Sequence, residues 1–133
     1  MKTLKIVIER SEDMFGAYAE NAEGIYGGGD TVEEAKQSIL DAIAIITEEF
    51  TPDNIPSILK GKYDIVYHFD AESFLNYYKG IFTNAALEKI TGINQRQLQH
   101  YSSGLKKPRQ PQLKKIEKGL HRLAAELQAV ELV

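Results

Sequence analysis

Amide, guanidinium and imidazole side chains gather in one short segment of the chain, where their chemistry suits the recognition of nucleic-acid bases. They are Asn94, Gln95, Arg96, Gln97, Gln99 and His100. Amides and guanidinium groups can form paired hydrogen bonds with the edges of adenine and guanine, whereas a solvated helix more usually carries glutamate and lysine. Three cations follow directly, at Lys106, Lys107 and Arg109. We expect the first set to contact DNA bases and the three cations to contact DNA phosphates.

Two short helices joined by a tight glycine turn are predicted to position these side chains. The first covers 85–91, is capped by Thr83 or Asn84, and stops at Gly92, which suits the left-handed conformation after a helix. The second begins after Asn94, whose side chain can cap it. Helices of this length and separation have helix-turn-helix proportions. The alternative interpretation is a helical hairpin used only for packing.

The second of these helices is predicted to turn one apolar face towards the protein. Ile93, Leu98 and Tyr101 follow the spacing i, i+5, i+8 and would hold it against the preceding helices. Gln97 occupies the capping-box position, and Gly104 ends the helix. The remaining polar side chains would then face outward.

Two further helices flank this pair. Asp70 caps a predicted helix that continues through Phe74 and Leu75 to Tyr78 and Ile81. A long C-terminal helix has Pro111 at its first position and carries a heptad stripe of Leu113, Ile116, Leu120, Leu123, Leu127 and Val130. Gly119 weakens that helix by about 1 kcal/mol relative to alanine. The last part of the stripe has no evident partner within the chain, so we expect a two-fold homodimer or a higher homo-oligomer.

The first half of the chain is predicted to be α+β. Period-2 or β-branched patterns indicate strands over 4–9, 14–19, 24–27 and 65–69. Between the third and fourth, apolar residues recur at helical spacing over 32–49, after a capping box of Thr31 and Glu34. Pro52, Pro56 and Gly61 mark a loop. The order β-β-β-α-β predicts an antiparallel meander with one helix across one face.

Catalytic chemistry is not indicated in this half. The glycine run 27–29 before Asp30 lacks the spacing of a phosphate loop, and we interpret it as a turn that needs positive φ. No pairing at a defensible spacing emerges among the carboxylates of Asp30, Asp41, Asp64 and Asp70. His68 is expected on the surface. The chain also has no cysteine and no nucleophile elbow, and its three histidines are scattered, so we expect a protein without catalysis, cofactor or metal.

Charge divides the 133 residues into two parts. Residues 1–70 hold 6 Lys/Arg and 14 Asp/Glu, a formal charge of −8, and residues 71–133 hold 10 and 5, a charge of +5. We expect two domains at this boundary, the second meeting a polyanion and the first a basic partner, although a coincidental distribution of solvated charge is the alternative. No membrane helix or signal peptide is evident, which predicts a cytoplasmic protein.

The segment 83–108, with the pattern LEKITGINQRQLQHYSSGLKKP, resembles the repressor-type helix-turn-helix of the XRE family. Glu88 departs from the small alanine frequent there. The whole chain resembles the HicB family of bacterial antitoxins, and FGAYAENAEGIYGGGDTVEEAKQSILDAI carries that likeness in the head. The resemblance implies a head, 1–70, with a partial ribonuclease-H-like fold that lacks a catalytic set and neutralises a small basic mRNA-cleaving toxin, HicA. It implies that the tail, 71–133, binds the operon's own promoter.

Two functions therefore remain open. The first is a non-enzymatic antitoxin that represses its own operon by sequence-specific binding to double-stranded DNA. The alternative is a ligand-sensing transcriptional regulator with a degenerate, non-catalytic nuclease-like head. A small basic protein encoded beside this chain favours the first, and a small molecule that saturably stabilises the protein favours the second.

Overall fold

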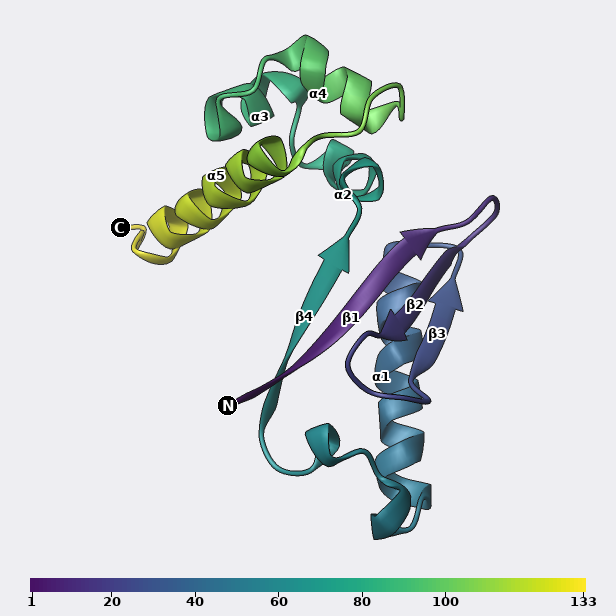
Figure 1. Cartoon of the computed structure of the whole chain (residues 1–133). Coiled ribbons are helices and arrows are strands. Elements are labelled where there is room, and N and C mark those ends of the chain that lie inside the picture. The colour runs from purple at the N-terminus through teal and green to yellow at the C-terminus, as the bar shows by residue number, and fades with distance from the viewer. The chain divides into compact units, whose positions relative to one another are not determined.

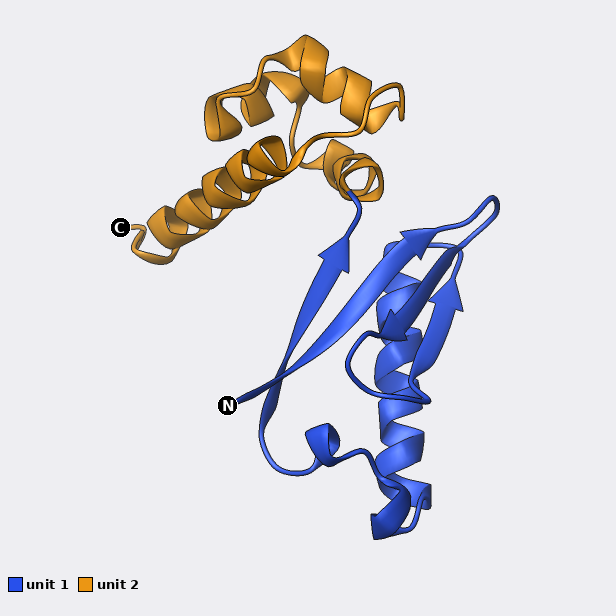
Figure 2. Ribbon diagram, viewed as in Figure 1, with its two compact units in different colours: residues 1–70 blue, residues 71–133 orange.

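The computed structural model describes all residues 1–133, and these divide into two compact units, 1–70 and 71–133 (Figure 2). The first unit contains a four-stranded sheet and a long helix, and the second contains only helices (Figure 1). The predicted α+β class is confirmed. The boundary lies between the acidic and the basic parts of the sequence.

The sheet of the first unit is mixed rather than antiparallel. Its strands are β1 (Lys2–Arg10), β2 (Phe15–Ala19), β3 (Tyr26–Gly29) and β4 (Tyr63–Phe69), in the spatial order β3-β2-β1-β4. The first three form the predicted antiparallel meander, but β4 pairs parallel to β1. The expectation for β4 was wrong because the intervening helix carries the chain back along the sheet. The next strand therefore runs in the direction of β3 and β1.

One face of this sheet is covered by helix α1 (Val32–Glu49), whose bounds are those predicted. Leu4, Ile6 and Ile8 alternate along β1 and are fully buried on this face. The buried residues of the helix are Val32, Ala35, Ile39, Ile43 and Ile46, so the predicted stripe is confirmed. Thr31 caps the helix through a 3.1 Å bond from the Glu34 N–H, and the Glu34 carboxylate accepts from the Asp30 N–H at 2.8 Å.

The glycine run 27–29 lies inside β3 and has no positive φ, so its interpretation as a turn was wrong. The strand begins two residues later than predicted, and the left-handed residue is Gly24, with φ 82°. A Cβ at Gly27 would lie 2.7 Å from the Ser38 Oγ, and one at Gly29 would lie 2.4 Å from the Glu34 Cβ. These glycines therefore allow the strand backbone to rest directly against α1.

Two single 3-10 turns, Pro52–Asn54 and Ser57–Leu59, replace the predicted loop after α1. The side chain of Leu59 is buried. The Lys2 ammonium donates to the backbone carbonyls of Ser57 and Lys60, which ties this segment to the start of β1.

The second unit contains α2 (Ala71–Tyr77), α3 (Asn84–Thr91), α4 (Gln95–Ser102) and α5 (Gln110–Gln128). The prediction that the first of these continues to Ile81 was wrong. A 3-10 turn, Tyr78–Gly80, follows α2, and the Tyr78 carbonyl accepts from both Ile81 and Phe82. This tighter winding turns Ile81 into solvent and lets Phe82 pack against the core.

The last helix also differs from the prediction at both ends. It begins at Gln110, so Pro111 is its second residue, and it ends at Gln128, so Val130 lies outside it. Ile116 is buried and Leu113 is half-buried, but Leu127 is 61% exposed. The first part of the heptad stripe therefore covers the core of the unit, and the last part does not.

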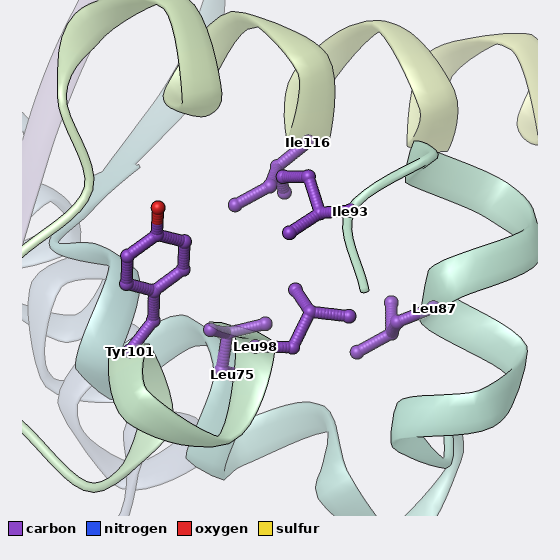
Figure 3. Packing of buried hydrophobic residues seen from close by; sticks show 6 residues of the cluster. All are labelled: Leu75, Leu87, Ile93, Leu98, Tyr101 and Ile116. Carbon is purple, nitrogen blue, oxygen red and sulfur yellow. The ribbon is translucent and has the colours of Figure 1, made fainter. Parts of the chain in front are cut away.

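The core of the second unit collects one or two side chains from each helix. Figure 3 shows these side chains converging from α2, α3, the turn before α4, α4 itself and α5. They are Leu75, Leu87, Ile93, Leu98, Tyr101 and Ile116. The predicted inward set of Ile93, Leu98 and Tyr101 is confirmed.

Gly119 brings α5 into direct contact with the backbone of α3. A Cβ at Gly119 would lie 2.3 Å from the carbonyl oxygen of Ile90 and 3.0 Å from its carbonyl carbon. Gly119 is buried at this crossing, and the backbone of Ile90 leaves no space for a methyl group there. The sequence pattern indicated only that Gly119 lowers helix propensity, whereas the packing of α5 on α3 requires a glycine at this position.

The sign of the change in unfolding free energy caused by Gly119→Ala tests this contact. Helix propensity alone predicts a gain of about 1 kcal/mol in the free energy of unfolding. Overpacking against Ile90 predicts a loss of roughly 1–3 kcal/mol, and we expect the loss. Urea unfolding followed by circular dichroism measures the difference, with Gly80→Ala as control because a Cβ there meets nothing within 4 Å. An increase in stability for Gly119→Ala contradicts the packing described.

Candidate nucleic-acid interface

The turn between α3 and α4 is closed by local side-chain bonds. Thr83 caps α3 by accepting from the Ala86 N–H at 3.0 Å, which decides between the two predicted caps. Gly92 adopts φ 78° after α3, as its position predicted. The Thr91 hydroxyl is buried, donates to the Leu87 carbonyl at 2.7 Å and accepts from the Ile93 N–H at 3.1 Å. The direction of the chain into α4 is thereby fixed.

Two further bonds fasten α4 to α3 on the outside of the core. The Glu88 carboxylate accepts from the Gln95 N–H at 2.9 Å, and the Asn84 amide donates to the Gln99 side-chain oxygen at 3.1 Å. A carboxylate at the N-terminus of a helix is favourable because the unpaired N–H groups there carry partial positive charge. Glu88 therefore joins the two helices.

The six candidate base-contacting residues are not equally available. Asn94, Gln95, Arg96 and Gln99 are exposed, whereas Gln97 and His100 are half-buried. The Asn94 side chain caps α4 through a 2.9 Å bond from the Gln97 N–H. The side chains of Gln95 and Arg96 are exposed and make no hydrogen bond or ion pair. These two, at the N-terminal end of α4, are the side chains most free to meet a ligand.

Gln97 has an internal partner that the earlier interpretation missed. Its side-chain amide donates to the Tyr101 hydroxyl at 2.8 Å. The signal was present in the sequence, since residues four apart on a helix are neighbours. His100 also departs from a simple outward position, because its Nδ1 is buried without a hydrogen-bond partner.

The three candidate phosphate-contacting cations lie after the other end of α4. Lys106, Lys107 and Arg109 are all exposed and form no ion pair. Gly104, with φ 80°, turns the chain here, and the Lys106 N–H donates to the His100 carbonyl at 3.1 Å. The eight residues of α4 span about 12 Å, which is close to the width of the DNA major groove. Amide and guanidinium side chains at one end of α4 have the chemistry to meet bases, and the cations after its other end have the chemistry to meet phosphates.

No comparable site is found in the first unit. Nowhere does a group of three or more His, Asp or Glu side chains come together in a way that could hold a metal ion. Asp41 accepts from Gln37 at 2.9 Å on α1, and Asp64 is exposed on β4. His68 is exposed as predicted, and its Nδ1 lies 3.7 Å from the Glu20 carboxylate. An open hollow of about 660 Å³ lies beside Tyr26 and Ile55, with Glu23 and Asp53 in its wall.

Comparisons with known proteins give no relative: no family model, curated protein or solved structure matches the chain. None of the helices combines the length and the apolar character needed to cross a membrane. Function must therefore be inferred from the residues and their arrangement.

Arg96 and the three cations allow a direct test of the interface. Arg96→Ala or Gln95→Ala should weaken binding to the DNA upstream of this chain's own gene by about 1–3 kcal/mol. Either variant should also relax the sequence preference at one base pair. Lys106→Ala, Lys107→Ala and Arg109→Ala should weaken binding to every sequence and lower the salt slope by about one unit each. Titration of the upstream duplex and a scrambled duplex at several salt concentrations separates the two effects.

Lys62→Ala serves as the charge control, because Lys62 belongs to the acidic unit. This substitution should leave the DNA affinity and the salt slope unchanged. Gln97→Ala is unsuitable as a sole probe, since it also removes the bond to Tyr101. Equal losses on both duplexes for Arg96→Ala would mean that α4 does not read bases.

Proposed function

We propose that the chain is a HicB-type antitoxin that binds operator DNA through its second unit and neutralises a small basic HicA-type toxin through its first. The observation that carries the proposal is the set of exposed side chains at the start of α4. Its N-terminal end presents two side chains without internal partners, Gln95 and Arg96, while caps and a buried face hold the helix against α3. Such an exposed amide and guanidinium pair can form paired hydrogen bonds with the edges of bases.

We interpret α3, the Gly92 turn and α4 as a helix-turn-helix motif with α4 as the recognition helix. Sequence-reading motifs of this kind meet base edges with residues near the start of the second helix. Gln95 and Arg96 occupy that position. The second unit carries a formal charge of +5, which supports binding to a polyanion.

A homodimer belongs to this proposal. Dimeric helix-turn-helix proteins meet half-sites about one turn of DNA apart. Leu127 and Val130 are 61% and 57% exposed at the end of the second unit, and a second copy would bury them. Sedimentation of the full chain measures this state, and a monomer at micromolar concentration would contradict it.

We interpret the mixed sheet, with α1 between β3 and the parallel β4, as the partial ribonuclease-H-like head that the resemblance implies. Its formal charge of −8 supports a basic protein as partner. The alternative, a head that senses a metabolite, would use the open hollow beside Tyr26. Saturable stabilisation of the chain by a small molecule in a thermal-shift screen would favour that alternative.

The proposed protein has no catalytic activity of its own. No three His, Asp or Glu side chains of the chain come together, and Asp41 accepts a hydrogen bond from Gln37. We expect purified chain to leave RNA and DNA uncut in the presence of magnesium or manganese, measured on labelled substrates. Cleavage that disappears in Asp30→Ala or Asp64→Ala would overturn this expectation.

The proposal requires that a small basic protein be encoded beside this chain, and binding of that protein tests neutralisation. We expect a complex on co-expression, with an association rate that falls as salt rises because opposite charges steer the encounter. Arg96→Ala in the full chain is the matched control: it should lose operator affinity and keep the affinity for the basic protein. If Arg96→Ala abolished both, the proposed division between the units would be wrong.

A further inference from the structure

The sheet of the first unit has one face that no element of residues 1–70 covers. Strand alternation sends Leu4, Ile6 and Ile8 towards α1 and their neighbours to the other side. The register aligns one row of side chains across all four strands on that open face. The row is Tyr26 on β3, Tyr18 on β2, Val7 on β1 and His68 on β4.

This row is largely aromatic, and together with Val66 it is accessible to a partner. Tyr26 is 70% exposed, Val66 beside the row is 43% exposed and Tyr18 is 36% exposed. Val66 stands opposite Lys5, one row away from the pair of Val7 and His68. Aromatic side chains with so much exposed surface are frequent at the centres of protein interfaces.

Carboxylates surround the row. Glu9 accepts from the Tyr18 hydroxyl at 3.3 Å, and the Glu20 carboxylate lies 3.7 Å from the His68 Nδ1. Asp64 lies on β4. Partial burial, and then the Glu9 carboxylate, raise the pKa of the Tyr18 hydroxyl, which stays a neutral donor at physiological pH. Lys5 is the one lysine or arginine among the strand residues whose side chains alternate onto this face.

The charge of the face distinguishes between two classes of ligand. Exposed tyrosines on a sheet can stack on single-stranded RNA, but such sites also carry positive charge for the phosphates. Three carboxylates on this face, within a unit of charge −8, repel a polyanion and attract lysine and arginine. Those cations can also lie over the tyrosine rings.

We propose that the open sheet face built on Tyr26, Tyr18 and Val66 is the docking surface for the small basic toxin. This inference rests on the proposed function and assigns the toxin to one side of the head. The apolar row would desolvate against the toxin, and the surrounding carboxylates would pair with its cations.

The test uses the full chain and the small basic protein that the proposed function requires beside it, with the dissociation constant measured by calorimetry. Tyr26→Ala and Val66→Lys should each weaken binding by about tenfold or more. Ile45→Lys is the matched control, because Ile45 is 51% exposed on α1, which covers the opposite face. It should change the constant by less than roughly twofold. Unchanged operator binding and unfolding midpoints show that each variant is folded.

The outcomes separate the inference from the proposed function. If the unmodified chain does not bind the basic protein, the proposed function fails and the docking surface fails with it. If the unmodified chain binds and Tyr26→Ala and Val66→Lys bind equally well, only the docking surface is overturned. The same holds if Ile45→Lys loses as much affinity for the basic protein as those two variants. Binding of single-stranded RNA that is lost in Tyr26→Ala would also overturn it.

Discussion

Direct contact between a helix and a glycine backbone determines the architecture of both units. In the first, Gly27 and Gly29 let the β3 backbone lie against the Ser38 and Glu34 side chains and the backbone of α1. In the second, Gly119 lets α5 rest on the Ile90 carbonyl of α3. A single methyl group at these positions would force the elements apart, because protein interiors have no spare volume at such crossings.

The arrangement of α4 follows from the second of these contacts. Helix α5 fixes α3, and α3 fixes α4 through the buried Leu98 and the bond from the Gln95 N–H to Glu88. A helix of eight residues is too short to be stable alone, so most of its polar groups serve its own structure. Gln97 and Asn94 are used in this way, and Gln95 and Arg96 remain free for a ligand.

The first contact leaves the sheet with two unlike faces. Helix α1 covers one face with a stripe of isoleucines, and no second helix of residues 1–70 covers the other. That other face combines exposed tyrosines with carboxylates, whereas the helical unit carries the excess of lysine and arginine. Each unit thus has its own surface chemistry, which supports a protein that holds a basic partner with one unit and DNA with the other.

Local signals in the sequence were sufficient to predict most of the elements. Apolar periodicity gave the bounds of α1, and the capping residues Thr31, Thr83 and Asn94 each accept from an N–H group three residues away. The candidate site could be located for the same reason, since its polar residues share one short helix. The division of charge between the two halves was likewise evident from the positions of the charged residues in the sequence.

Only the tertiary structure decided what depends on residues far apart in sequence. The parallel pairing of β4 with β1, the role of Gly119 against Ile90 and the row from Tyr26 to His68 all join distant segments. A glycine that costs a helix its propensity and a glycine that a crossing requires look the same in a sequence. The difference lies in the neighbour that a Cβ would meet, and only the packed fold supplies that neighbour.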